Sequence, residues 1–216
     1  MRPGPAALQH SLRVGGLAPV LLACLLCTAG VASLAGRADV STLLLVRVSL
    51  MVMAASVAGT IGDTIAVLSD ACPVGRPRQW LLRLMPALAV LALSWGCFVV
   101  AVGAAQPAAA GTVPWGGLTV ELTAYTAVGL AAAAGRGRNH PDDSLLAGVA
   151  AVAALALLSV LPLLPQRWTL ISYPGSPDWA AVHWRWAALA AGAGLLAAWC
   201  FRDPATPTRL QPAGRR

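Results

Sequence analysis

Residues 144–164 read SLLAGVAAVAALALLSVLPLL, and this stretch without a charged side chain decides the class of fold. An α-helix needs about 20 apolar residues to cross the hydrocarbon core of a bilayer. This stretch has that length, and similar apolar segments lie at about 16–35, 40–68, 80–105, 114–134 and 180–201. We therefore predict an all-α, polytopic membrane protein. Six transmembrane helices form a single domain over residues 1–202, and residues 203–216 form a disordered cytoplasmic tail.

The composition excludes a water-soluble globule. Of the 216 residues, 58% are hydrophobic and only 11% are charged, and the mean hydropathy is +0.72. Soluble domains carry about 25% charged residues, so this chain lacks the charge to cover a solvated surface. The formal net charge is +7. A basic chain can bind nucleic acid, but cytoplasmic loops of membrane proteins are also basic, and we expect the lipid bilayer and no nucleic acid as partner.

The arginines gather in alternate loops between the apolar segments. Cytoplasmic loops carry the excess of basic residues in membrane proteins, so this pattern places both termini inside the cell membrane. Tryptophans crowd the opposite ends of the segments, as expected for an aromatic belt at the outer interface. The inner arginines are Arg2, Arg13, Arg76, Arg78, Arg83, Arg136, Arg138, Arg202, Arg209, Arg215 and Arg216, and loops on the other side hold Arg37 and Arg167.

Three charged residues lie inside apolar segments: Arg47, Glu121 and Arg185. Charges within a membrane are costly and face a partner or a cavity. At 1.5 Å per residue, all three lie roughly 8–11 Å below the outer edge of the bilayer. His183 lies just above them. This intramembrane polar layer either lines an outward cavity or pins three helices together, and we favour the second reading. For His183 we expect stacking on a neighbouring tryptophan rather than metal binding.

The segment between the second and third spans has the composition of an interfacial elbow. Prolines and a glycine interrupt the helix, and arginines then alternate with Trp and Leu, which suits a position between headgroups and water. Such an elbow can dock a cytoplasmic protein, and the alternative is an ordinary basic loop. The candidate docking residues of this elbow are Asp70, Pro73, Arg76, Arg78 and Arg83.

Motifs of soluble catalysis are missing from the chain. The sequence has no Walker motif, no dinucleotide fingerprint, no His-Glu-x-x-His and no Gly-x-Ser-x-Gly. We therefore expect no enzyme activity, no catalytic residue, no metal and no cofactor in this chain.

The chain resembles the actinobacterial six-span integral membrane proteins described as permease-like subunits of ABC transporters. The resemblance implies a transmembrane subunit that couples a separate cytoplasmic ATP-binding subunit to movement of an unknown substrate, in a homo- or heterodimer. It covers most of the chain and is carried by Arg47–Asp63, Asp70, Pro73-Val74, Arg83, Arg167-Trp168, Asp178–Trp186 and Arg202–Ala205.

A more distant likeness is to type-2 ABC exporter permeases. In those proteins an elbow between spans two and three contacts the ATPase, and short outer elements separate the last two spans. The corresponding segments here are Asp70–Arg83 and Leu163–Trp179, but the N-terminal lead is shorter than in that class. Two other functions stay open. One is a non-transporting membrane scaffold or regulator. The other is an ion- or proton-coupled secondary transporter that uses Glu121 and Arg47.

Overall fold

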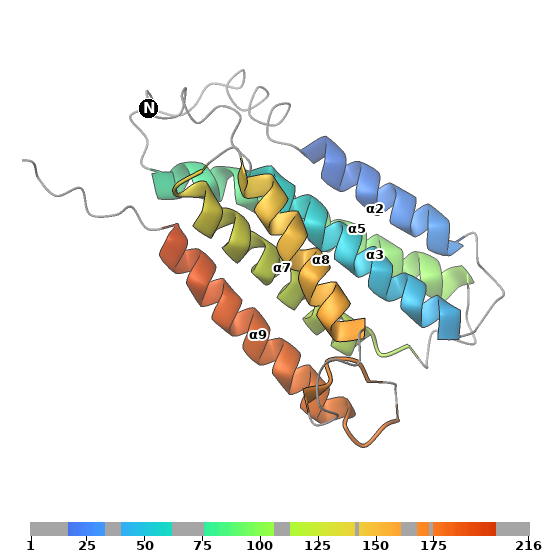
Figure 1. The fold of residues 1–216 in the computed structure, drawn as a ribbon. Coiled ribbons are helices and arrows are strands. Elements are labelled where there is room, and N and C mark those ends of the chain that lie inside the picture. The colour runs from blue at the N-terminus through green and yellow to red at the C-terminus, as the bar shows by residue number, and fades with distance from the viewer. Residues whose placement is uncertain are drawn as a thin grey trace, which may run out of the picture.

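The computed structural model describes residues 17–32, 40–61, 76–105, 113–140, 143–160, 168–172 and 175–201. Over these ranges the chain forms six α-helices, one short 3-10 helix and no strand, which confirms the all-α prediction. The helices lie side by side in one bundle (Figure 1). They are α2 (Leu17–Ala32), α3 (Val40–Ala58), η1 (Gly59–Ile61), α5 (Arg76–Ala105), α7 (Trp115–Gly137), α8 (Ser144–Val160) and α9 (Trp179–Cys200).

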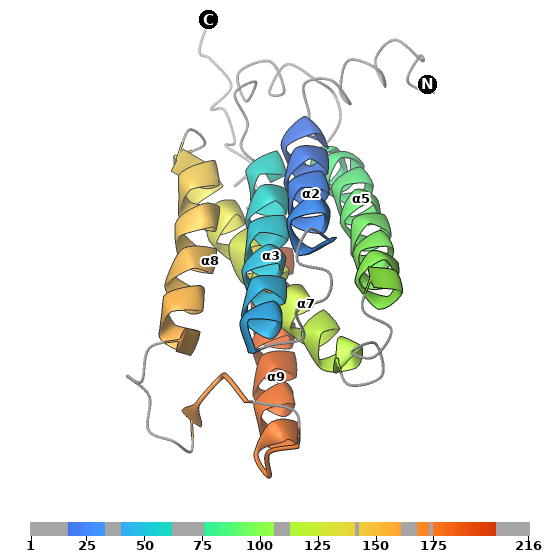
Figure 2. The ribbon, with the colours of Figure 1, turned by 90° about the vertical axis from the view of Figure 1, so that its right-hand side faces the viewer.

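Successive helices run in opposite directions along the bundle, as the turned view shows (Figure 2). The start of α5 therefore meets the end of α9, where the rings of Trp80 and Phe201 lie 5.0 Å apart. The end of α7 lies at the same end of the bundle, because the guanidinium of Arg138 lies 5.3 Å from the centre of the Trp199 ring. We call this the arginine end. The other end carries residues 168–172, which we call the cap segment.

Helix α7 is the central helix. It packs against α3, α8 and α9, and α2 packs on α3 and α5 at one side of the bundle. More than half of the buried residues of α7 are small, namely Ala124, Thr126, Gly129, Ala131, Ala133 and Ala134. Small side chains let helix backbones approach closely, which is the usual means of helix association in membranes.

Helices α3, α7 and α8 approach one another closely at three small residues, Ala58, Gly129 and Gly148. A Cβ added at Gly148 would lie 2.7 Å from the Cβ of Ala58 and 3.0 Å from the carbonyl oxygen of Gly129. A Cβ added at Gly129 would lie 3.2 Å from the Cβ of Ala58. A Cβ at Gly148 would therefore force the neighbouring backbone or side chains to shift, whereas a Cβ at Gly129 would need its neighbours to give way by only a few tenths of an ångström.

The helices vary in length and apolar character. Within the described ranges, two helices are long and apolar enough to cross a membrane, at Leu84–Ala104 and Trp115–Gly137. Shorter apolar helices lie at Val20–Gly30, Leu43–Ala58 and Ser144–Ser159.

Helix limits differ from the predicted segments at several places, and α7 continues three residues past the predicted end, to Gly137. Helix α5 begins at Arg76, four residues before the predicted start, because Pro77 is tolerated in a first turn, where its missing N–H needs no partner. The predicted first, second and fifth segments continue past α2, η1 and α8 into residues that lie outside the described ranges. The predicted tail lies outside these ranges as well.

Candidate functional site

Arg47 of α3 and Glu121 of α7 form a buried ion pair near the cap segment. Arg47 Nε donates to Glu121 Oε2 at 3.1 Å, and Arg47 Nη2 donates to Oε1 at 3.0 Å. The side chains are only 5% and 2% exposed. The planar guanidinium fork matches a carboxylate in this two-bond geometry, which makes it a strong form of ion pair. The structure thus brings together two members of the predicted polar layer.

A third hydrogen bond ties this ion pair to the cap segment. Arg47 Nη2 also donates to the backbone carbonyl of Ser172 at 3.1 Å. Taking two charges out of water is costly, and the cost is offset only when further hydrogen bonds satisfy the remaining donors. The Ser172 carbonyl supplies such a bond, and the ion pair therefore also fixes the position of the cap segment.

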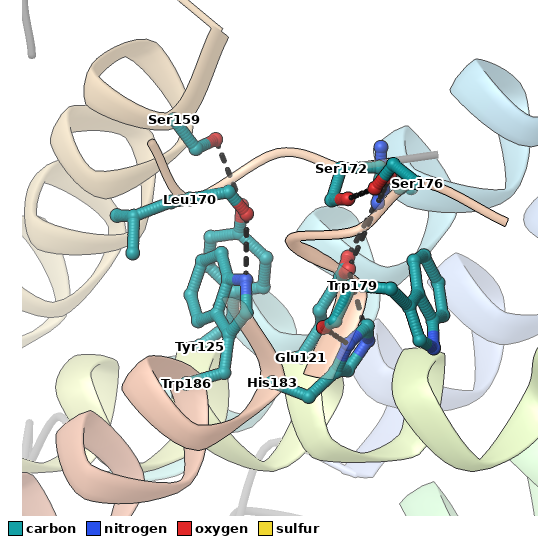
Figure 3. Close-up of polar contacts among 10 residues, drawn as sticks. Glu121, Tyr125, Ser159, Leu170, Ser172, Ser176, Trp179, His183 and Trp186 are labelled. Atoms are coloured by element: carbon teal, nitrogen blue, oxygen red, sulfur yellow. Dashed lines mark hydrogen bonds and ion pairs between the residues drawn. The ribbon is translucent and has the colours of Figure 1, made fainter. Parts of the chain in front are cut away.

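His183 of α9 lies beside this pair (Figure 3). Its Nδ1 lies 2.8 Å from the carbonyl oxygen of Trp179, and its ring centre is 4.1 Å from the Trp179 ring. Its Nε2 lies 3.9 Å from Glu121 Oε1. That distance is too long for a hydrogen bond, and the buried Nε2 has no hydrogen-bond partner.

Gly117 makes the space for the imidazole ring. A Cβ at this position would lie 2.2 Å from His183 Nε2 and 2.8 Å from Cδ2. Gly117 and Glu121 are four residues apart, so they share one face of α7. That face therefore combines a gap for the ring with a carboxylate beside it.

Arg185, the third charge of the predicted layer, points to the cap segment. Its Nη1 donates to the carbonyl of Thr169 at 2.8 Å. The neighbouring Trp186 donates from Nε1 to the carbonyl of Leu170, also at 2.8 Å. Arg185 therefore holds the cap segment to α9, while Arg47 holds it to α3.

Several residues that lie around the Arg47–Glu121 ion pair and the cap segment were not predicted from the sequence. Tyr125 shares a 3.2 Å hydrogen bond with Ser159 of α8, and its ring packs 5.0 Å from that of Trp186. Gly117, Glu121 and Tyr125 recur every four residues, and this spacing marks one helix face. That signal was available in the sequence. The backbone carbonyls that accept from Arg47, Arg185 and Trp186 leave no such signal.

The structure places the arginines of the predicted elbow on helix α5. Arg76, Arg78 and Arg83 lie on its first turns, at the arginine end, and Asp70 and Pro73 lie outside the described ranges. The end of α7 contributes further charge there. Arg136 pairs with Asp143 at 2.8 Å, and both side chains are about half exposed.

Comparisons with known protein families, with characterised proteins and with solved structures find no significant match to this chain. Across the parts of the chain that the structure describes, no group of three or more His, Cys, Asp and Glu side chains is arranged to hold a metal ion. The buried cluster combines a charge pair between Arg47 and Glu121 with an imidazole whose Nε2 lies 3.9 Å from the carboxylate.

Proposed function

We propose that this chain is an integral protein of the cell membrane with six spans and both termini in the cytoplasm. We further propose that it serves as the permease-like transmembrane subunit of an ABC transporter. One observation supports the membrane location: large apolar side chains are exposed on the outward faces of the bundle.

These apolar side chains occur on each of the other five α-helices. Leu25 of α2 is 67% exposed, Leu93 of α5 71%, Leu146 of α8 70% and Leu195 of α9 74%, and Leu44 of α3 is 54% exposed. Soluble monomers rarely expose contiguous apolar patches beyond a few hundred Å². In lipid the same surface needs no cover, because acyl chains are as apolar as leucine. The pattern therefore supports a bundle that faces lipid on all its outer helices.

The charge distribution supports the proposed orientation. The start of α5 and the end of α7 bring their arginines to one end of the bundle, and the cap segment lies at the other. Basic residues flank the cytoplasmic ends of membrane helices. Trp80 and Trp199 lie at the arginine end, where amphipathic rings suit the headgroup level.

A topology experiment tests this orientation. A fluorescent reporter fused after residue 216 is expected to fold in the cytoplasm and fluoresce. An epitope inserted after Gly175 is expected to be accessible to antibody on intact spheroplasts. An inaccessible epitope at this position, in cells where the C-terminal reporter fluoresces, would contradict a membrane crossing by α9.

The proposed coupling site is the first part of α5, which carries Arg76, Arg78 and Arg83. This part of the helix lies at the proposed cytoplasmic end, where a separate ATPase has access to it. The sequence resemblance to permease-like subunits supports this assignment. The chain itself carries no Walker motif, so ATP hydrolysis is assigned to the partner.

Co-purification tests the coupling site. The tagged chain, isolated from its native host in mild detergent, is expected to bring down an ATPase in stoichiometric amount. Replacing the three α5 arginines by Ala is expected to abolish this association. The matched control is the pair Arg136→Ala and Arg138→Ala, which removes charge from the same end but leaves α5 intact. If both sets of variants retain the ATPase, or both lose it, the assignment to α5 fails.

A membrane scaffold is the second candidate function, and one specific observation favours it. Arg47 and Glu121 are buried and satisfy each other, as expected of charges that hold helices together. A well-folded chain that brings down no ATPase, but brings down another membrane protein in stoichiometric amount, would support the scaffold in place of the permease.

A further inference from the structure

We propose that His183 and Glu121 form a proton-binding site at the cap end of the bundle, in which a proton on His183 Nε2 bridges α9 to α7. The proposal does not depend on an ABC transporter function. It rests on a buried ring nitrogen that lacks a hydrogen-bond partner and faces a carboxylate oxygen 3.9 Å away.

The contact with Trp179 determines which nitrogen carries the proton in the neutral ring. A carbonyl oxygen only accepts, so His183 Nδ1 must donate to the Trp179 carbonyl, 2.8 Å away. The neutral imidazole then presents a lone pair at Nε2 to Glu121 Oε1. Two acceptors face each other, and a buried acceptor without a donor is unfavourable. A proton on Nε2 replaces this contact by a charge-assisted hydrogen bond, whose ordinary length is about 2.7–2.9 Å.

The groups around the ring decide what protonation does. Glu121 Oε1, the oxygen nearest to His183, already accepts from Arg47 Nη2 at 3.0 Å. On protonation the single carboxylate is therefore shared by two cations, one from α3 and one from α9. Glu121 of α7 is the charged group nearest to the His183 ring, and Arg47 of α3 is bound to that carboxylate. The other titratable groups of these elements make contacts elsewhere: Tyr125 of α7 shares a hydrogen bond with Ser159, and Arg185 of α9 donates to the Thr169 carbonyl. Asp178 precedes α9 as its N-cap residue, and the nearby loop contributes the neutral hydroxyls of Ser172 and Ser176 (Figure 3).

Closing the 3.9 Å gap draws α9 towards α7 at the cap end. Arg47 also donates a hydrogen bond to the carbonyl of Ser172. The movement of α9 towards α7 therefore also affects the position of the cap segment. A proton on His183 Nε2 therefore changes the packing of the cap end.

Nitrogen NMR of the full chain in lipid nanodiscs tests the proposal. The chain has three histidines, so replacing His10 and His140 by Gln leaves His183 as the only labelled imidazole. At pH 8 we expect a proton on Nδ1 alone. At pH 5 we expect protons on both nitrogens, with the Nε2 proton shifted downfield and protected from exchange with water. A neutral ring at pH 5, or a proton on Nε2 at pH 8, would overturn the proposal.

Two neighbouring glycines provide matched variants that leave every charge in place. In Gly117→Ala the new methyl would lie 2.2 Å from Nε2 and displace the ring, so the downfield, protected Nε2 proton is expected to disappear at pH 5. Gly116→Ala adds the same methyl one residue away, where no atom lies within 4 Å, and is expected to retain the signal. Retention of the signal in Gly117→Ala would show that the Nε2 proton does not face Glu121, and would overturn the proposal. If Gly117→Ala does not fold, the spectra at pH 5 and pH 8 still test the proposal, because they need no substitution at the site.

Discussion

Replacing Gly148 by Ala tests whether the helix bundle is as closely packed as described. The added Cβ would lie 2.7 Å from the Cβ of Ala58, 3.0 Å from the carbonyl oxygen of Gly129 and 3.2 Å from the Cβ of Ala133. Carbon atoms pack best at 3.5–4.0 Å, so α8 must move away from α3 and α7 by about 1 Å. Such overpacking costs about 1–3 kcal/mol, and the better helix propensity of Ala returns up to about 1 kcal/mol. We expect a net loss of about 1–2 kcal/mol in the free energy of unfolding.

Thermal unfolding in detergent, followed by tryptophan fluorescence, measures this loss. For a chain of this length, 1–2 kcal/mol corresponds to a fall in Tm of about 2–8 °C. The matched control is Gly192→Ala on α9, where an added Cβ meets no atom within 4 Å. This control is expected to unfold at the wild-type temperature or slightly above it. Equal Tm values for the two variants would refute the close packing of α3, α7 and α8.

The charge cluster and the cap segment give two further predictions for the same assay. Arg47→Met and Glu121→Leu are each expected to cost about 3–5 kcal/mol, because each leaves one buried charge alone, and the double variant is expected to cost less than their sum. Strict additivity would show that the two side chains do not interact. Trp186→Phe removes the donor to the Leu170 carbonyl and is expected to cost about 1 kcal/mol, whereas Trp184→Phe, at a ring that is 76% exposed, is expected to leave Tm unchanged. Equal effects of the two tryptophan variants would contradict the described hydrogen bond.

The helices were predictable because apolar segments are read directly along the chain. The prediction for residues 114–134 corresponds to α7, Trp115–Gly137, and the prediction for 180–201 corresponds to α9, Trp179–Cys200. The start of α5 was missed, since the prolines before residue 80 were read as an interruption. Proline is compatible with the first turn of a helix, so Pro77 marks the beginning of α5 instead.

The candidate site was predictable only in part. Counting residues from the segment ends placed Arg47, Glu121 and Arg185 at one depth, and the structure joins Arg47 to Glu121 directly. Arg185 instead donates a hydrogen bond to the carbonyl of Thr169. Depth along a helix follows from the rise per residue, but the direction of a side chain depends on how each helix is rotated against its neighbours. Sequence alone does not give that rotation.

By itself, the sequence determined the all-helical fold and the number of apolar segments, because these depend on local composition and on backbone hydrogen bonds within each helix. The gathering of arginines in alternate loops was equally readable. Only the tertiary structure decided that α7 is the central helix and that His183 fits against Gly117 beside a carboxylate already held by Arg47. These features arise from contacts between helices far apart in the chain, and such contacts depend on packing in three dimensions.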